Sequence, residues 1–314
     1  MKIAVILVNY NGKQYNTACI ESIRESRGID QVKIIVVDNA SRDNSMEILK
    51  ERYGSTDSVE LIGLDDNYGF SHANNVGIRR AMEWGAEAVV LLNNDTEIEP
   101  DMLLKMAQCS GRHEGAVIAP KIYYSDDRKR IWSAGGSASP VIRKVRHIGL
   151  DEPERGLYDR ECRIAFATGC CLWVPAAVIR QAGLLDERFF LYYEDTEYSF
   201  RLQRKGISIY YCPQAVMYHK VSASTRGADS PLCAYYIARN WLLCNRIHLG
   251  AKYPVFLIYY GLNRMACCLL WLLHGKRELV IATGRGIRDY RKKRFGRSAD
   301  YQGASAVTVH SEQA

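Results

Sequence analysis

The stretch VVLLNNDTEI, residues 89–98, places four apolar residues directly before two amides and a carboxylate. The apolar half is typical of a buried strand, which would end at Asn93, Asn94 and Asp95. In an open parallel α/β sheet, the carboxyl ends of the strands form the crevice where ligands bind. Asp95 could therefore serve a metal or phosphate site, but Asn and Asp are also common in turns for local reasons. This stretch alone favours neither interpretation, so the rest of the chain has to decide.

Apolar runs alternate with helical segments in the first third of the chain. The runs are typical of buried strands and cover 3–9, 32–38, 59–64 and 88–93, and the helical segments cover about 13–26, 43–53 and 71–84. Apolar strands that alternate with helices predict βαβ units and a parallel sheet covered on both faces. No GxGxxG follows the first strand, which argues against a dinucleotide-binding fold. The sequence therefore predicts an α/β fold with a mostly parallel sheet flanked by helices.

The pattern after residue 116 is less regular. It predicts a helix over 194–205, strands over 207–212 and 215–219, and helical segments over 235–249 and 253–275. A Ser/Thr/Gly-rich stretch over 222–230 marks a change in character. We therefore expect an α/β domain over 1–230, a helical, basic extension over 231–297 and a disordered polar tail over 298–314.

Charge and cysteine usage exclude several classes of protein. The 314 residues carry a net charge of +7, and segment 275–297 alone holds nine Lys and Arg against two acidic residues. The remainder is neutral on balance, which argues against nucleic-acid binding. The ten cysteines include no CxxC pair, which favours free thiols in a reducing cytosol over a disulfide framework. The apolar run near the N-terminus is too short for a signal peptide, so we expect a protein that is not secreted.

Polar residues follow three of the predicted strands. They are Asn9 and Tyr10, Asp38 and Asn39, and Asn93 to Asp95. Three such endings make a purely local turn explanation less attractive. The loop NYGFSHANNVG (67–77) leads into a helix whose N-terminus would suit a phosphate. Together these features predict a nucleotide diphosphate across the sheet edge, with Asp95 placed to bind a hard divalent cation through oxygen.

An ordered set of motifs resembles the family-2 glycosyltransferases with the GT-A fold. The motifs are VNYN (8–11), VVDNASRDNS (36–45), NYGFSHANNVG (67–77), LLNNDTEI (91–98), TGCCLWVP (168–175), GLLDERFFLYYEDTEYSFRLQRKG (183–206) and YCPQAVMYHKVSAST (211–225). The resemblance covers roughly residues 3–250 and is strongest to the rhamnosyltransferase-like bacterial enzymes. Asn93 stands where the fuller DxD metal motif has its first Asp, which puts the number of protein–metal bonds in question.

The resemblance implies a role for single residues of the donor site. Asp38 would accept a hydrogen bond from the pyrimidine ring of the nucleotide, and Asn9 and Tyr10 would line the base. Asp95 would bind Mg²⁺ or Mn²⁺ that bridges the diphosphate, and His219 would complete the metal shell. The further residues that would bind the donor are Asn39, Asn94, Gly69 and His72, of which the last two would line the pyrophosphate.

The resemblance also implies the catalytic base, Asp195, next to Glu194. An inverting transfer attacks the anomeric carbon opposite the leaving nucleotide diphosphate, so a carboxylate must take the proton of the acceptor hydroxyl. A cation must neutralise the charge that grows on the departing phosphate. Each assignment has a structural alternative: Glu194 and Asp195 could stabilise a helix N-terminus, Asp38 could cap a turn, and His219 could be an ordinary strand histidine.

The segment 253–275 and the basic residues after it suggest contact with a membrane. The segment approaches the ~20 residues that span a bilayer, but Asn263 and Arg264 near its middle disfavour spanning. We expect a helix in the interface, with basic residues facing anionic headgroups; a soluble helix hairpin is the alternative. These basic residues are Arg285, Arg288, Arg291, Lys292, Lys293, Arg294 and Arg297. A peripheral location at the inner face of the cell membrane would suit a polyprenyl-diphosphate-linked glycan acceptor.

The leading hypothesis is an inverting, metal-dependent transfer of one sugar, L-rhamnose from dTDP-rhamnose, to a cell-surface glycan precursor. A UDP-hexose donor is the first alternative, because no residue separates thymine from uracil. A nucleotidyltransferase would carry a Gly-rich, basic loop after the first strand, where this chain has NYNGKQ. A non-catalytic scaffold is disfavoured because Asp95, Asp195 and His219 are all present. A processive synthase is disfavoured because the chain has no QxxRW motif.

Overall fold

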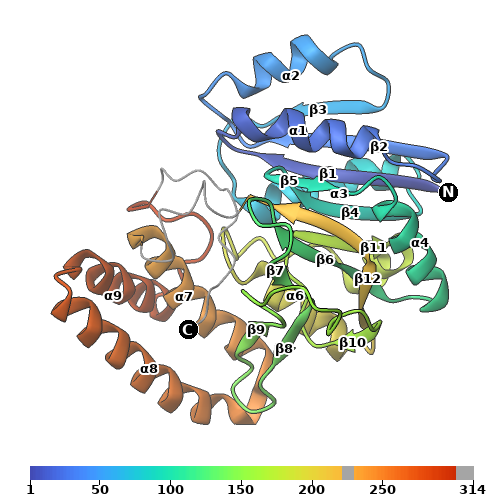
Figure 1. The fold of residues 1–314 in the computed structure, drawn as a ribbon. Coiled ribbons are helices and arrows are strands. Elements are labelled where there is room, and N and C mark those ends of the chain that lie inside the picture. Colours follow the sequence, from blue (N-terminus) through green and yellow to red (C-terminus); the bar gives the residue numbers. More distant parts are fainter. Residues whose placement is uncertain (221–229, 302–314) are drawn as a thin grey trace.

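A computed structural model describes residues 1–220 and 230–301 of the chain (Figure 1). The helices are α1 (Lys13–Arg24), α2 (Ser45–Tyr53), α3 (Phe70–Glu83), α4 (Met102–Arg112), α5 (Ala176–Ala182), α6 (Glu194–Arg204), α7 (Pro231–His248), α8 (Tyr253–Leu273) and α9 (Arg277–Arg291). The strands are β1 (Lys2–Asn9), β2 (Gln31–Asp38), β3 (Val59–Gly63), β4 (Ala88–Asn93), β5 (Thr96–Ile98), β6 (Val117–Tyr124), β7 (Ile131–Ser133), β8 (Gly136–Ala138), β9 (Val145–His147), β10 (Cys162–Ile164), β11 (Cys171–Pro175) and β12 (Ile209–His219).

The central sheet confirms the predicted α/β architecture. Within the described residues it has the order β10-β12-β6-β11-β4-β1-β2-β3, with β5 beside β12 and β7 beside β6. The neighbours β4, β1, β2 and β3 are all parallel, and β12 is parallel to β6. Helical crossovers return the chain to the same edge after each parallel strand, so the carboxyl ends of β1, β2 and β4 lie together.

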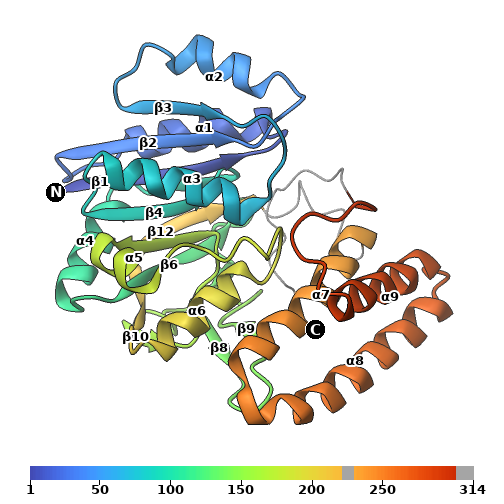
Figure 2. The same ribbon diagram turned by 180° about the vertical axis from the view of Figure 1, so that it is seen from behind.

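Alternate residues of β1 belong to different cores because the sheet is covered on both faces. Ile3, Val5 and Leu7 pack with side chains of α1, α2 and α4. Ala4 and Ile6 belong to the opposite core, together with side chains of α3 and of the later helices. Figures 1 and 2 show helices on both sides of the sheet. Burial on both faces explains why the strands appear in the sequence as continuous apolar runs.

The second half of the sheet differs from the prediction in one respect and contains an antiparallel strand that the sequence did not place. The expected strands 207–212 and 215–219 are one strand, β12, whose register with β6 shifts between Cys212 and Val216. This irregularity includes Pro213, which cannot donate a ladder hydrogen bond. In addition, β11 inserts antiparallel between β4 and β6, which is one of the antiparallel pairs that the predicted mostly parallel sheet leaves room for.

Three helices follow the sheet and gather on one side of it, with α8 outermost (Figures 1 and 2). Helix α9 packs closely on α7: a Cβ on Gly286 would lie 2.4 Å from the carbonyl oxygen of Tyr235. The tail expected to be disordered begins inside the described residues, where Ser298 is buried and its N–H donates to Tyr236 Oη (2.9 Å). Residues 302–314 of that expected tail, and most of the linker expected over 222–230, lie outside the described residues.

Candidate active site at the carboxyl edge of the sheet

The predicted polar strand ends meet at one edge of the sheet. In the parallel register of β1 and β2, Asn9 lies opposite Asp38. Across the β1–β4 pair, Val8 lies opposite Asn93. The polar endings of three strands therefore share one site, although they are far apart in the sequence.

Asn9 is the centre of a buried hydrogen-bond network beneath this edge. Its Nδ2 donates to Asp38 Oδ1 (2.5 Å) and to Ser45 Oγ (2.8 Å). Its Oδ1 accepts from the Nδ2 atoms of Asn16 (2.8 Å) and Asn94 (3.2 Å). The side chain is fully buried, and both ends of its amide are engaged within the protein. Asn9 therefore holds Asp38 and Asn94 in place, and its contact with the nucleotide base, which the resemblance implied, stays a prediction.

Asp38 and Tyr10 lie beside this network. The second carboxylate oxygen of Asp38 accepts from the Ser41 N–H (3.0 Å). This is the turn-capping contact that the local explanation of Asp38 predicts, so it does not by itself indicate a ligand. Tyr10 follows Asn9 and is almost buried. The structure thus places Asp38 and Tyr10 at the predicted edge.

The loop before α3 is held by the protein instead of presenting free amides. Asn39 joins it to β2: its Oδ1 accepts from Tyr68 N (3.0 Å) and its Nδ2 donates to Asn67 Oδ1 (2.8 Å). The N–H of Gly69 also donates to Asn67, and that of Phe70 donates to the Phe190 carbonyl (2.8 Å). The N–H groups of Tyr68, Gly69 and Phe70 therefore already have acceptors within the protein, and the expectation that the N-terminus of α3 binds a phosphate stays a prediction. Asn39 accordingly has a positioning role.

Gly69 and His72 lie where this loop meets the segment before α6. Gly69 has φ +91°, and a Cβ there would lie 2.6 Å from the Phe190 carbonyl oxygen, so only glycine allows this close approach. His72 is partly exposed, and its Nδ1 lies 2.8 Å from Glu187 Oε2. The pKa of Glu187 is lowered, because hydrogen bonds from Asn75 and His72 outweigh the effect of burial. Gly69 therefore serves the packing of the loop, and His72 is paired with a carboxylate.

Asp95 and His219 form the buried pair that the metal hypothesis predicts. Asp95 Oδ2 lies 3.3 Å from His219 Nε2, and both side chains are completely inaccessible to solvent. Within the described part of the chain, neither carboxylate oxygen of Asp95 accepts a hydrogen bond. The pair is fixed by β12 and β5, where His219 lies opposite Thr96, and by the Lys220 N–H, which donates to the Asp95 carbonyl (3.0 Å).

The chemistry of this pair fits a divalent cation. A buried carboxylate that lacks hydrogen-bond donors is costly, and a bound cation would remove that cost. Carboxylate oxygen and imidazole nitrogen are ligands that Mn²⁺ accepts, and carboxylates suit Mg²⁺. The Trp132 ring packs edge-on against His219 at 4.6 Å between centroids, which holds the imidazole in place. Burial raises the pKa of the neighbouring Cys19 to about 12, so that thiol stays neutral.

Asp195 lies in the first turn of α6, and both of its carboxylate oxygens accept hydrogen bonds. Oδ2 accepts from the Gly169 N–H (3.0 Å), and Oδ1 accepts from the Thr196 N–H (2.6 Å). Two residues then link Asp195 to the metal motif, because the carbonyl of Cys170 accepts from the Asn93 N–H (2.9 Å). The fold thereby joins the proposed base and the end of β4 through the short segment that leads into β11.

Glu194, the neighbour of Asp195, is buried in surroundings that favour its neutral form. Burial raises its pKa well above 4.5, and the nearby charge of Asp195 raises it further. Its Oε2 has no hydrogen-bond partner among the described residues. Two adjacent carboxyl groups with such different surroundings are typical of sites that need one proton acceptor. Glu194 is therefore suited to remaining protonated, while Asp195 accepts hydrogen bonds.

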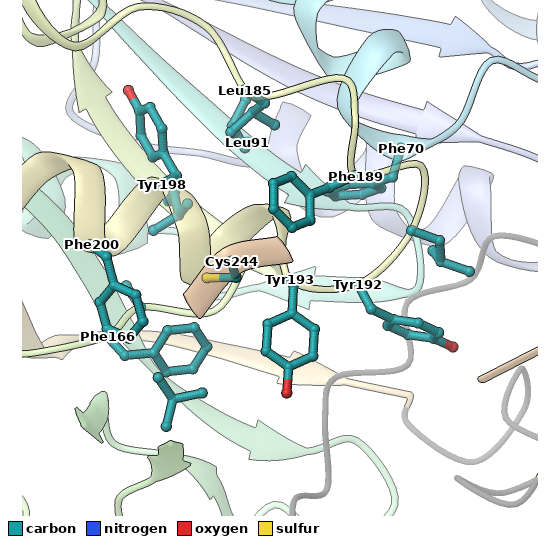
Figure 3. Close-up of a cluster of buried hydrophobic side chains, with 14 of the residues drawn as sticks. Phe70, Leu91, Phe166, Leu185, Phe189, Tyr192, Tyr193, Tyr198, Phe200 and Cys244 are labelled. Atoms are coloured by element: carbon teal, nitrogen blue, oxygen red, sulfur yellow. The ribbon is translucent and has the colours of Figure 1, made fainter. Parts of the chain in front are cut away.

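The turn before α6 has an unusual backbone. Tyr192 and Tyr193 have φ of 67° and 72°, a left-handed conformation that costs a bulky residue of order 1–3 kcal/mol. Asn240 of α7 stabilises this turn, since its Nδ2 donates to the carbonyls of Leu191 and Tyr192 (2.9 Å each). Figure 3 shows Phe189, Tyr192 and Tyr193 projecting from this turn, with Cys244 of α7 among the surrounding side chains. The strained turn therefore fixes where α6 begins and thereby the position of Asp195.

Arg239 and Asn240 are the residues whose role sequence reasoning missed. Arg239 is buried; its guanidinium donates to Asn240 Oδ1 (3.0 Å) and to the Gly296 carbonyl (2.8 Å), and it lies over the Tyr236 ring. It therefore connects α7 to the segment after α9. A polar Arg-Asn pair inside a largely apolar helix is the sequence signal that could have indicated buried residues with a positioning role.

Comparisons with known proteins agree with this geometry. Residues 4–181 match the sequence profile described as "Glycosyl transferase family 2". The chain is 26% identical to the "dTDP-rhamnosyl transferase RfbF" of Shigella flexneri, over 93% of this chain and 92% of that protein. It is 25% identical to the "N-acetylglucosaminyl-diphospho-decaprenol L-rhamnosyltransferase" of Mycobacterium tuberculosis (strain CDC 1551 / Oshkosh), over 70% of this chain and 76% of that protein.

A solved structure supports the fold. The mannosyltransferase PcManGT from Pyrobaculum calidifontis, in complex with GDP-Man and Mn²⁺, superposes with a TM-score of 0.56 at 15% identity. The match covers 93% of this chain and 86% of that chain. At this identity it shows the fold alone. Because the family profile covers more than half of the chain, the protein is a glycosyltransferase with the GT-A fold and belongs to glycosyl transferase family 2.

Proposed function

We propose that the protein transfers a single sugar, with inversion, from a nucleotide diphosphate sugar to a glycan acceptor, and that it requires a divalent cation. The observation that carries this proposal is the buried Asp95–His219 pair at the end of β4, joined through Gly169 and Cys170 to Asp195. A cation site and a proton acceptor on separate chain segments are what an in-line displacement needs.

The donor is proposed to be dTDP-rhamnose. The support is the name of the Shigella relative, a dTDP-rhamnosyl transferase that aligns over nearly the whole chain. Asp38 and Tyr10 at the ends of β2 and β1 would contact the nucleotide base. Asn9, Asn39 and Asn94 would hold these contacts in place through the buried amide network. A UDP-hexose donor is the second candidate, because no described residue of the site separates thymine from uracil.

The chain's own residues account for the proton and for the geometry of transfer. As the acceptor oxygen attacks the anomeric carbon, Asp195 takes the hydroxyl proton. The bond between the anomeric carbon and the phosphate oxygen breaks, and its electron pair leaves with the nucleotide diphosphate. Mg²⁺ or Mn²⁺ held by Asp95 and His219 would neutralise the charge on that leaving group. Glu194, protonated beside Asp195, avoids a second negative charge at the point of attack.

The acceptor is proposed to be a lipid-linked glycan at the cytoplasmic face of the membrane. The segment Gly250–Leu273 has a mean hydropathy of 1.5 and is only 11% buried, so by length and composition it could cross a membrane. Its inward side carries Tyr253, Phe256 and Tyr260, which are buried, and Arg264, which lies over the Trp241 ring at 5.4 Å. The outward side is apolar and exposed. The decaprenol-linked acceptor named for the mycobacterial relative is consistent with such a surface.

The arrangement favours a helix that lies in the interface over one that spans. Arg264 points toward the protein, so the exposed side of α8 carries large apolar residues: Val255, Leu257, Ile258, Leu262, Met265, Leu269, Leu270, Leu272 and Leu273. The run Arg291 to Arg294 at the end of α9 is exposed and would face anionic headgroups. Arg297 was expected to do the same, but it donates to Asp66 Oδ2 (2.6 Å) and therefore joins the C-terminal segment to the sheet domain.

Flotation of the full-length protein with anionic liposomes tests the membrane surface. We expect the wild type to float at low salt and high salt to release it only in part, because salt screens charges but not apolar burial. The triple variant Ile258→Gln, Leu262→Gln, Leu269→Gln should remain at the bottom of the gradient. Wild-type protein that does not float at low salt would refute the membrane proposal.

A panel of nucleotide sugars tests the proposed donor. Purified enzyme with Mn²⁺ or Mg²⁺ should be stabilised against thermal unfolding by dTDP-rhamnose more than by UDP-hexoses, and should hydrolyse or transfer it only when the cation is present. A larger shift with a UDP-sugar would assign the donor to the second candidate. Full activity after chelation would refute the cation requirement.

A further inference from the structure

A second group of metal-ligating side chains lies away from the carboxyl edge of the sheet. Cys109 and His113 are four residues apart at the C-terminal end of α4, so they lie on one side of the helix. Glu161 lies directly before β10, and Cys212 lies on β12 before its irregularity. Three separate parts of the chain thus bring together two thiols, one imidazole and one carboxylate, which we call the α4–β12 cluster.

The distances in the α4–β12 cluster are compatible with a shared ion. The ligand atoms of Cys109, His113 and Glu161 all lie within 4.8 Å of one another. His113 Nε2 lies 2.5 Å from Glu161 Oε1, and the Cys212 thiol is close enough to the Cys109 thiol for the two to influence each other's pKa. Around a tetrahedral zinc ion, with Zn–S of about 2.3 Å and Zn–N of about 2.0 Å, neighbouring ligand atoms are about 3.5 Å apart. Cys109, His113 and Glu161 are therefore close enough to share one ion, and a movement of the Cys212 side chain, which neighbours Cys109, would supply the fourth ligand.

The surroundings of the cluster fit a zinc site in access and in charge. Cys109 and Cys212 are fully buried, whereas the side chains of His113 and Glu161 are 24% and 21% exposed, which leaves a route from solvent. Arg112 donates to the other carboxylate oxygen of Glu161 (2.6 Å). Two thiolates and one carboxylate around Zn²⁺ carry one net negative charge, which the Arg112 guanidinium would balance. The Tyr210 ring stacks on His113 at 3.6 Å and orients it.

We propose that Cys109, His113, Cys212 and Glu161 bind Zn²⁺. Thiolate and imidazole ligands select zinc over Mg²⁺ and Mn²⁺, which prefer oxygen ligands such as Asp95. The ion would bind at a point separate from the Asp95–His219 pair and would tie α4 to β12 and to the segment before β10. It would therefore be a structural site, and its occupancy would not depend on the donor sugar.

Cobalt substitution of the full-length protein tests the site directly. Protein stripped of metal by a chelator and then titrated with Co²⁺ should develop the thiolate-to-cobalt charge-transfer band and the intense visible bands of tetrahedral cobalt. Added Zn²⁺ should abolish both sets of bands. The Asp95–His219 pair contains no thiolate, so the variant His219→Ala should keep the charge-transfer band.

Variants identify the ligands. Cys109→Ser with Cys212→Ser should lose the charge-transfer band, and His113→Gln, at the partly exposed rim, should weaken Zn²⁺ binding at least tenfold. Cys162→Ser is the matched control, because this exposed cysteine is next to Glu161 but outside the cluster. Its loss should leave both the charge-transfer band and the Zn²⁺ affinity unchanged. Absence of the charge-transfer band in wild-type protein, or Zn²⁺ affinity unchanged in folded His113→Gln, would overturn the proposal and leave a partly exposed ion pair beside two buried thiols.

Discussion

Replacing Asp195 by Asn removes the proposed proton acceptor with almost no change in shape. A positioned general base contributes roughly 10²–10⁴-fold to the rate, which corresponds to about 2.7–5.4 kcal/mol in the barrier. Asp195 acts on the acceptor hydroxyl, so donor binding should stay nearly unchanged. We therefore expect a fall in turnover number by this factor, with a Kd for the nucleotide sugar within about threefold of wild type.

The hydrogen bonds of Asp195 also predict a cost in stability. Both oxygens accept from buried N–H groups, those of Gly169 and Thr196. An Asn side chain has only one oxygen, so one of these donors would face an NH₂ group. An unpaired buried donor costs about 1–3 kcal/mol, and the free energy of unfolding should fall by that amount. Thermal unfolding of the variant must therefore be measured first, and the rate assay run well below its transition.

The matched control is Asp101→Asn. Asp101 occupies the N-cap position of α4, is half-exposed and lies outside the site. If carboxylates at helix N-termini serve only the helix dipole, both variants should lose about 0.3–1 kcal/mol of stability and little activity. We expect the control to keep at least half of the wild-type rate. Folded Asp195→Asn enzyme that retains more than a tenth of the wild-type rate would refute the assignment of Asp195 as base.

Three further predictions follow from the site. Asp95→Ala should abolish the gain in donor affinity that Mn²⁺ gives to the wild type, and equal gains by titration calorimetry would contradict the cation site. Glu194→Gln should be more stable than wild type at alkaline pH, because the pKa of Glu194 is raised in the folded state. As the pH rises from the ordinary glutamate pKa near 4.5 to the raised pKa, the free energy of unfolding of the wild type falls by about 1.4 kcal/mol per pH unit. Denaturant unfolding of both proteins at several pH values measures the difference. Asn240→Ala should lose about 3 kcal/mol of stability, from three hydrogen bonds at about 1 kcal/mol each. The variant should also transfer the sugar more slowly while it keeps its affinity for the donor. An unchanged transfer rate would show that the turn at Tyr192 does not position the base.

The sequence alone predicted the parallel half of the sheet and the edge at which the site lies. Strands β1 to β4 are buried on both faces, so each is a continuous apolar run whose polar ending shows where the strand stops. Parallel βαβ connections have a fixed hand and return each strand to the same edge. The meeting of Asn9, Asp38 and Asn93 followed from these local patterns. The motif resemblance then named Asp95, His219 and Asp195, whose roles stay predictions.

Tertiary structure alone decided which atoms of these residues are available to bind a ligand. A side chain after a strand can point into the network beneath the edge or outward to a ligand, and only the packing of neighbouring segments settles the difference. Asn9 and Asn39 proved to be fully engaged within the protein, and the amides before α3 were already bonded to Asn39, Asn67 and Phe190. Periodicity cannot report such contacts, because it describes one segment at a time.

The antiparallel insertion of β11 and the function of Asn240 both depend on contacts between segments that are far apart in the sequence. The strand β11 is as apolar as its neighbours, so nothing within it states its direction or its place between β4 and β6. Asn240 matters because α7 crosses the strained turn at Tyr192, a contact between segments nearly fifty residues apart. The sequence therefore determined where strands β1 to β4 and their connecting helices lie and where those strands end. The tertiary structure decided which polar groups are paired with the protein and which remain for a ligand, because that depends on contacts that no local pattern encodes.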